Sequence, residues 1–156
     1  MSLIILILAF TILVWLILFS ALFGYRLMSV HGDSMQPSLY EGDAVLMRYT
    51  EFNKIEVGSI VTLQDPSKGW IIHRLINIEP YSNDTYYFKT RGDNNSCPEF
   101  WIISNDEKIL MSHVRFIHIG YILDFLNTMP GRVILTLLVV SLVISTMIRR
   151  RRLKIE

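Results

Sequence analysis

The strongest constraint on this chain is a pair of long apolar runs, one near each end. The first run covers residues 3–23 and contains no charged residue. As an α-helix it would be about 31 Å long, close to the thickness of a bilayer core. A cleaved secretory signal peptide has basic residues before a shorter apolar core. No lysine or arginine precedes this run, so we expect an uncleaved N-terminal transmembrane anchor.

The second apolar run covers residues 133–148, between Arg132 and the four arginines at positions 149–152. Sixteen residues are slightly short for a bilayer span, so hydrophobic mismatch or snorkelling would have to make up the difference. Its few polar residues are serine and threonine, which favours a C-terminal transmembrane helix. A buried amphipathic helix or an interfacial helix is the alternative.

The basic residues around the second run predict the orientation in the membrane. The tail of residues 149–156 carries four arginines and Lys154, so the positive-inside rule places it in the cytoplasm. Residues 25–130 would then form an extracytoplasmic or lumenal domain of an integral plasma-membrane or endoplasmic-reticulum protein. Arg26, just after the first run, argues weakly against this orientation.

The composition between the two runs excludes several kinds of site. Residues 26–130 hold 13 acidic and 9 basic residues, which argues against a nucleic-acid partner. Cys97 is the only cysteine, so no internal disulfide is expected, and its polar surroundings suggest an inert thiol. The four histidines lack the spacing of metal ligands. We therefore expect neither a metal nor a cofactor.

The segment between the apolar runs predicts a mainly β domain. Short stretches of β-branched, aromatic and apolar residues are separated by turn-forming glycine, proline, asparagine and aspartate. These stretches indicate a compact, mostly antiparallel sheet or a partly closed barrel. The predicted strands are residues 44–49, 59–64, 70–77, 85–91 and 114–119.

Ser34 lies in a short motif suited to an exposed nucleophile. It follows Gly32, which lets backbone and substrate approach closely, and it precedes Met35 and Pro37, of which the proline stiffens the chain. A serine hydroxyl is a poor nucleophile at neutral pH unless a neighbouring base takes its proton. An ordinary Asp-Ser turn without chemistry remains the alternative.

His73 is the candidate base for that serine. In a strand, alternation places His73 on the same face as Ile71 and Leu75, and such apolar neighbours favour the neutral ring that a general base needs. His31, three residues from Ser34, remains a competing base. The other two histidines, His113 and His118, fit structural positions near the last predicted strand.

Asp93, in the sequence Gly92-Asp93-Asn94-Asn95, is the candidate acidic partner. A carboxylate there can orient a histidine ring and stabilise its charged form during proton transfer. A plain Gly-Asp-Asn turn is the alternative for this motif.

Taken together, the order Ser34, His73, Asp93 resembles the type I signal peptidases over most of residues 24–95. The resemblance is to the endoplasmic-reticulum and archaeal type, in which histidine stands where most bacterial members have lysine. It implies that Ser34 is the nucleophile, His73 the base and Asp93 the acidic residue. Gly32 offers no side-chain hydroxyl to an oxyanion hole, which leaves backbone N–H groups as donors. Some members have a second acidic residue after this block, and Glu99 is the nearest one here.

The resemblance implies a membrane-bound serine endopeptidase that removes signal peptides from exported preproteins. An extended substrate would add as a strand beside the site, with shallow pockets for small side chains. Gly32 and Met35 are the candidate substrate-binding residues, although Met35 fits core packing equally well. The preproteins and the lipid bilayer are the expected partners. A peptidase for a few dedicated substrates and an inactive, membrane-tethered β-domain that binds exported chains are the alternatives.

Overall fold

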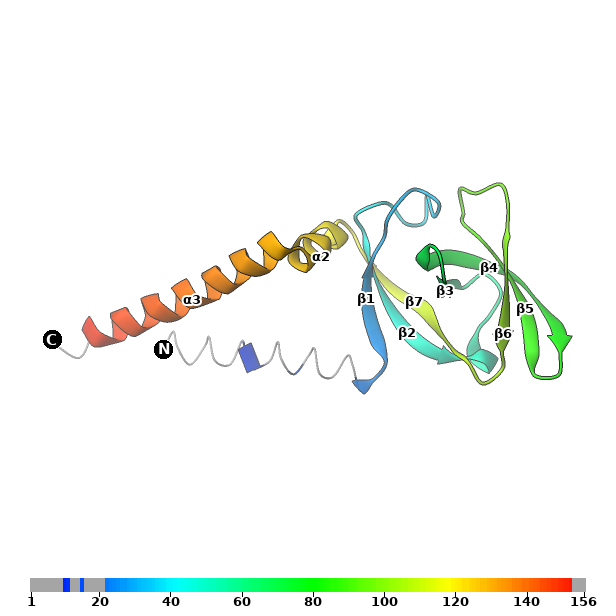
Figure 1. Ribbon diagram of the computed structural model, residues 1–156, viewed down its shortest axis with the longest axis horizontal. Helices are drawn as coiled ribbons and strands as arrows, with labels where there is room; N and C mark the ends of the chain where they lie inside the picture. Colours follow the sequence, from blue (N-terminus) through cyan, green and yellow to red (C-terminus); the bar gives the residue numbers. More distant parts are fainter. Residues whose placement is uncertain (1–9, 12–14, 16–21, 153–156) are drawn as a thin grey trace. The chain divides into compact units, whose positions relative to one another are not determined.

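The computed structural model describes residues 10–11, 15 and 22–152, and it contains one seven-stranded antiparallel sheet (Figure 1). The strand order across the sheet is β1-β2-β7-β3-β4-β5-β6, so β7 separates the first two strands from the other four. Figure 1 shows β1, β2 and β7 on one side of the domain and β4, β5 and β6 on the other. The strands are β1 (Tyr25–Ser29), β2 (Ala44–Glu51), β3 (Ile60–Asp65), β4 (Gly69–Ser82), β5 (Thr85–Arg91), β6 (Glu99–Ser104) and β7 (Lys108–Phe116).

The chain divides into two compact units, and the sheet belongs to the unit Gly24–Tyr121. A single turn of 3₁₀-helix, η1 (Phe52–Lys54), follows β2 within this unit. Two helices follow β7: α2 (Ile119–Asn127) begins in the sheet unit, and α3 (Met129–Arg152) lies in the other unit.

Two hydrophobic clusters form the core of the sheet unit. Burial of each large apolar side chain contributes about 1.5–3 kcal/mol to folding. One cluster joins β3, β4 and β5 with their neighbours through Ile55, Val61, Leu63, Leu75, Phe88, Ile103 and Ile109. The other joins β2 and β7 to the loop between β1 and β2 through Val30, Met35, Leu39, Val45, Met47 and Leu110. The loop that carries Ser34 is therefore anchored in the core on both sides of that serine.

The mainly β, antiparallel architecture predicted from the sequence is confirmed. The predicted strand 85–91 matches β5, and three other predicted strands correspond to β2, β3 and β4 with shifted ends. The last predicted strand, residues 114–119, was wrong at both ends, because β7 covers Lys108–Phe116 and α2 begins at Ile119. The sequence analysis missed β1, β6 and α2. Strands β1 and β6 form the two edges of the sheet.

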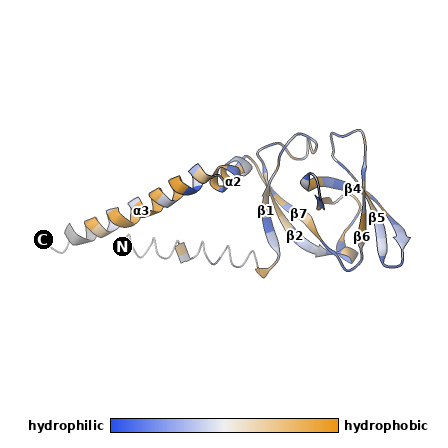
Figure 2. Ribbon diagram, in the orientation of Figure 1, coloured by the Kyte–Doolittle hydropathy of each residue, from blue (hydrophilic) through white to orange (hydrophobic). Residues whose placement is uncertain are grey.

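Helix α3 covers the second apolar run, for which the sequence predicts a C-terminal transmembrane helix. Within the described part of the chain, Met129–Ile148 is the one helix long and apolar enough to cross a membrane. Figure 2 shows apolar residues along its length. The helix begins four residues before the predicted boundary at residue 133. The predicted N-terminal anchor, residues 3–23, lies outside the described residues except at positions 10, 11, 15, 22 and 23, and so does the end of the basic tail, residues 153–156.

Candidate active site

Ser34 lies in the loop that connects β1 to β2. Backbone hydrogen bonds close the base of this loop: the Val30 N–H donates to the Asp43 carbonyl at 2.9 Å, and the Gly42 N–H donates to the Val30 carbonyl at 3.0 Å. Met35, next to Ser34, is only 2% exposed and packs in the core. The buried methionine fixes the backbone beside a half-exposed serine, which is a suitable arrangement for presenting a hydroxyl at the surface of a fold.

The residues expected to bind substrate lie on either side of that serine. Gly32 is exposed, with a positive φ of 77°, a backbone conformation that residues with a side chain rarely adopt. Met35 belongs to the core, as the core-packing interpretation expected, and it also lines the pocket that contains Ser34.

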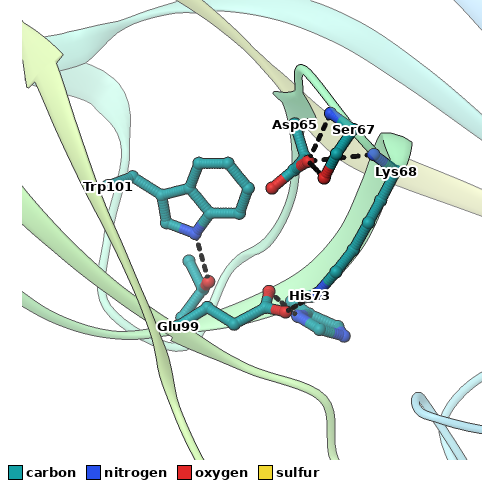
Figure 3. Close-up of polar contacts among 7 residues, drawn as sticks. Asp65, Ser67, Lys68, His73, Glu99 and Trp101 are labelled. Atoms are coloured by element: carbon teal, nitrogen blue, oxygen red, sulfur yellow. Dashed lines mark hydrogen bonds and ion pairs between the residues drawn. The ribbon is translucent and has the colours of Figure 1, made fainter.

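His73 lies in β4 opposite Val61 of β3, and it is 6% exposed. Its neighbour two residues along the strand, Leu75, is fully buried, as expected if the two side chains share the inner face. The His73 Nδ1 atom lies 2.9 Å from Oε2 of Glu99 (Figure 3). An ionised carboxylate only accepts hydrogen bonds, so a neutral ring in contact with one carries its proton on Nδ1 and its lone pair on Nε2.

Glu99 begins β6, and the sheet register explains how it reaches His73. Thr90 of β5 pairs with Leu75 of β4 on one side and with Glu99 on the other. Residues paired across neighbouring strands share a face, so Glu99 lies on the inner face with Leu75 and His73. The Trp101 indole N–H donates to the Thr90 hydroxyl at 2.8 Å and holds this register next to Glu99 (Figure 3).

Lys68 is a second neighbour of the Glu99 carboxylate. Its Nζ atom lies 3.4 Å from Glu99 Oε1, and it comes from the turn between β3 and β4 (Figure 3). Asp65 shapes this turn by accepting hydrogen bonds from the backbone N–H groups of Ser67 and Lys68 and from the Ser67 hydroxyl. The Ser67 hydroxyl and these backbone donors hold the pKa of Asp65 below its usual value. The sequence analysis did not single out Lys68.

One pocket of about 240 Å³ brings these groups together. Ser34, His73 and Glu99 all line it, and His31 and Lys68 border the same space. The end of β1 and the start of β4 supply most of the remaining wall, through Ser29, Val30, Trp70, Ile71 and Ile72. The two histidines differ in their surroundings, because His31 is exposed whereas His73 is buried against a carboxylate.

The Asp93 carboxylate binds Arg74 and not His73, the residue predicted to be its partner. This carboxylate binds the Arg74 guanidinium through two contacts, at 2.8 Å to Nε and 2.7 Å to Nη2. The prediction that Asp93 orients His73 is therefore corrected: the carboxylate on the His73 ring belongs to Glu99. Alternation explains the exchange, because Arg74 follows His73 directly and points to the opposite face of β4. A planar guanidinium also matches a carboxylate at two points, whereas an imidazole offers only one.

The pair formed by Asp93 and Arg74 supports the loop that carries Ser34. Hydrogen bonding from Arg74 holds the pKa of Asp93 below its usual value against the opposing effect of burial, and the Ser38 hydroxyl adds to this lowering. The same guanidinium donates to the Ser38 hydroxyl at 3.0 Å and to the Gly58 carbonyl at 2.8 Å. The carboxylate thus fixes an arginine that holds the loop four residues after the candidate nucleophile.

The rest of the Gly-Asp-Asn-Asn motif contacts the candidate nucleophile through the backbone. The Asn94 N–H donates to the Ser34 carbonyl at 2.8 Å. A Cβ atom at Gly92 would lie 2.5 Å from the same carbonyl oxygen, so only glycine fits there. This motif, interpreted from the sequence as a source of an acidic catalytic residue, packs directly against the peptide of Ser34.

Known proteins match this chain over the region that contains Ser34 and His73. A family model described as "Signal peptidase, peptidase S26" matches residues 3–87, more than half of the chain, including Ser34 and His73. Signal peptidase I W of Bacillus subtilis (strain 168) is 31% identical over 97 residues, which cover 62% of this chain. The matched region spans half the length of that relative. The chain belongs to the signal peptidase family, peptidase S26.

Proposed function

We propose that this protein is a membrane-bound serine endopeptidase that removes N-terminal signal peptides from exported preproteins. One observation carries the proposal most directly. His73 is buried with a carboxylate on Nδ1, and it lines the same pocket as Ser34. A hydroxyl, an imidazole and an orienting carboxylate in one pocket are the components of nucleophilic acyl transfer. Membership of the signal peptidase family supports the substrate class.

In the proposed reaction, the neutral ring of His73 takes the hydroxyl proton of Ser34 on Nε2 as Oγ attacks the scissile carbonyl carbon. The resulting imidazolium keeps its Nδ1 proton on Glu99, whose negative charge stabilises it. His73 then gives the proton on Nε2 to the leaving amine, and the C–N bond breaks to leave an ester on Ser34. His73 in turn takes a proton from a water molecule as the water oxygen attacks the ester carbon. The bond from this carbon to Oγ breaks as His73 returns the proton to Oγ, which restores the Ser34 hydroxyl and releases the signal peptide with a new carboxyl group.

Backbone N–H groups are the proposed donors to the negatively charged oxygen of the tetrahedral intermediate. Gly32 has no hydroxyl to offer, so the Ser34 N–H is the nearest candidate donor. The contacts from Asn94 and Gly92 to the Ser34 carbonyl support this role, because they restrain the peptide that follows the donor. We assign Asp93 a positioning role through Arg74, without direct participation in proton transfer.

The proposed substrate is an extended segment with small side chains next to the cleaved bond. The pocket is small, at about 240 Å³, and segments of β1 and β4 flank it. An extended peptide between two such segments can form main-chain hydrogen bonds with either of them. We place the catalytic domain on the extracytoplasmic side, with α3 and the predicted N-terminal anchor in the membrane and the basic tail in the cytoplasm.

Cleavage of a preprotein by the purified full chain tests this proposal. The wild-type protein should release a signal peptide, and Ser34→Ala should abolish release without changing the thermal unfolding midpoint. Ser82→Ala is the matched control, because Ser82 is an exposed serine at the end of β4. Mass spectrometry of the product locates the cleaved bond. Normal cleavage by Ser34→Ala would contradict the assignment of the nucleophile, and a wild-type protein that binds preproteins without cutting them would favour the inactive alternative.

A further inference from the structure

A buried carboxylate outside the proposed chemistry lies at the base of the loop that carries Ser34. The Asp43 side chain is fully buried. It accepts hydrogen bonds from the Tyr40 N–H at 2.8 Å and the His118 N–H at 3.2 Å. The Nε atom of Arg115 lies 2.6 Å from Oδ2, the oxygen that also accepts from Tyr40, so the buried charge has a cationic partner.

Arg115 comes from β7 and holds the loop at more than one point. Besides its ion pair with Asp43, it donates from Nη1 to the Ser38 carbonyl at 2.8 Å. Its guanidinium carbon also lies 5.3 Å from the centre of the Tyr40 ring. A single planar cation therefore contacts three positions between Ser38 and the start of β2.

Two arginines from different strands meet at Ser38. Arg74 of β4 binds the hydroxyl of this serine, and Arg115 of β7 binds its carbonyl. Each arginine is fixed in turn by its own carboxylate, Asp93 for Arg74 and Asp43 for Arg115. The loop is thus clamped from two sides, four residues after Ser34.

The chain that follows Arg115 completes the second clamp. A Cβ atom at Gly120 would lie 2.2 Å from the Asp43 carbonyl oxygen, so the start of α2 packs directly on this turn. The Tyr121 ring packs just as closely on Gly42, where an added Cβ atom would lie 2.0 Å away. These contacts all come from residues beyond the region 3–87 that the family model matches.

We propose that Arg115 is a positioning residue for Ser34, acting through Asp43 and the Ser38 carbonyl. This inference rests on the proposed peptidase function and extends the machinery of that function to the end of β7. Loss of the clamp shifts the Ser34 hydroxyl relative to His73 and leaves the walls of the pocket in place. Turnover is therefore more sensitive to this change than substrate affinity is.

Hydrogen–deuterium exchange of the full chain in detergent micelles tests the clamp without relying on activity. Arg115→Ala should speed exchange in the loop from Val30 to Asp43, while exchange in β4 and β5 stays as in the wild type. Removing the cation from a buried carboxylate can unfold a domain, so Arg115→Lys is a second variant. Lysine keeps the charge but cannot reproduce the planar fork, and it should loosen the same loop less. Unchanged exchange in the loop of folded Arg115→Ala, or of Arg115→Lys where the alanine variant does not fold, would overturn the proposal.

Kinetics give the second readout, with Arg48→Ala as the matched control, since the guanidinium of Arg48 lies over the Tyr25 ring on another part of the sheet. Arg115→Ala should lower kcat about 100-fold, the scale expected for a small misplacement of reacting groups, with KM changed less than about 3-fold. Added guanidinium ion should restore part of the lost kcat.

Two results contradict the positioning role of Arg115. One is a loss of kcat/KM that comes mainly from a higher KM. The other is no rescue by guanidinium in a variant whose loop exchanges hydrogen as in the wild type. If the wild type shows no Ser34-dependent cleavage, the proposed function fails, and hydrogen exchange still decides the clamp.

Discussion

His73 and Arg74 are neighbours in β4, and each binds a different carboxylate. One carboxylate lies in the loop after β5, and the other lies at the start of β6. His73 faces the pocket and binds Glu99, whereas Arg74 faces the other way and binds Asp93. The first pair joins a titratable ring to an acceptor beside a serine. The second pair joins an always-charged guanidinium to an acceptor that lies against the serine's loop.

In the proposed mechanism, the first pair takes part in the chemistry and the second supports the loop. A ring that gains and loses a proton in catalysis benefits from a partner that fixes its tautomer, the role proposed for Glu99. A guanidinium is not deprotonated at neutral pH, so Arg74 cannot act as a base and its pair with Asp93 holds groups in place. Variants that remove each partner in turn should therefore differ in kind as well as in size.

The largest effect is expected from removal of the proposed base. His73→Ala should lower kcat by about 10⁴-fold or more, and the double variant with Ser34→Ala should be little worse, because the two residues act as a unit. Initial rates of preprotein cleavage measure this effect. His31→Ala is the control, since His31 lines the same pocket. A near-normal rate for His73→Ala together with a large loss for His31→Ala would show that His31 is the base.

The next largest effect is expected at Glu99. An amide in Glu99→Gln can donate to Nδ1 and so favour the wrong tautomer of His73, which should lower kcat by about 10²- to 10⁴-fold. Glu99→Asp keeps the charge and should retain more activity. Steady-state kinetics compare these variants with Glu107→Gln, which changes an exposed glutamate. A kcat for Glu99→Gln within 2-fold of the wild-type value would remove Glu99 from the mechanism. Such a change corresponds to about 0.4 kcal/mol of activation free energy.

Asp93→Asn should affect stability more than chemistry. Loss of the two charge-assisted hydrogen bonds to Arg74 should cost about 1–3 kcal/mol of folding free energy. Activity should fall by about 10-fold, because the loop around Ser34 loosens while His73 keeps its partner. Denaturant unfolding and cleavage assays on the same samples give both numbers. A loss of kcat larger than that of Glu99→Gln, with stability unchanged, would reverse the roles of the two carboxylates.

The smallest effect is expected on stability when the pH falls from 7 to 5. Burial by itself raises the pKa of Asp43, but hydrogen bonds from Tyr40, His118 and Arg115 outweigh it, so the pKa lies below its ordinary value of 3.8. The pKa of Asp93 is lowered from the same value by Arg74. Lowered values mean that the stabilisation from both groups is fully present above about pH 4 and is lost as the pH falls through the folded-state pKa.

Activity should respond to pH in a different range from stability. A mechanism that needs a neutral histidine loses rate over the range in which histidines gain charge, between about pH 8 and 5. Circular dichroism at pH 5 should still show a folded domain, and the cleavage assay at the same pH should show little activity. Loss of structure and activity at the same pH would mean that unfolding, and not protonation of a base, causes the acid decline.

Much of the fold was predictable from the sequence because the relevant signals are local. Turn residues and β-branched stretches marked β5 and most of β2 to β4, and the second apolar run marked α3. Strand β6 was missed because it follows a polar loop and its pattern is short. The boundary of β7 was wrong because Ile117 and Ile119 look like strand residues, although one lies in a turn and the other begins a helix.

The site was predictable as a set of motifs but not as a set of contacts. Ser34 and His73 were predicted because each lies in a distinctive motif, and the two residues line one pocket. The partner of His73 was not, because the choice between Asp93 and Glu99 depends on which face of β4 each carboxylate meets. That face follows from the register of β4, β5 and β6, and β6 was not predicted. Arg115 left no signal in the sequence, since it lies 77 positions from Ser38, the residue it binds.

The tautomer of His73 tests most directly whether Glu99 orients this ring while Asp93 serves only to hold Arg74. Nitrogen-15 NMR of the full chain with labelled histidine, at a pH of about 8 where histidines are neutral, reports which ring nitrogen carries the proton. The account predicts a protonated Nδ1 with a downfield, hydrogen-bonded proton, lost in Glu99→Gln and kept in Asp93→Asn. A signal that survives Glu99→Gln and disappears in Asp93→Asn would contradict it and return the orienting role to Asp93.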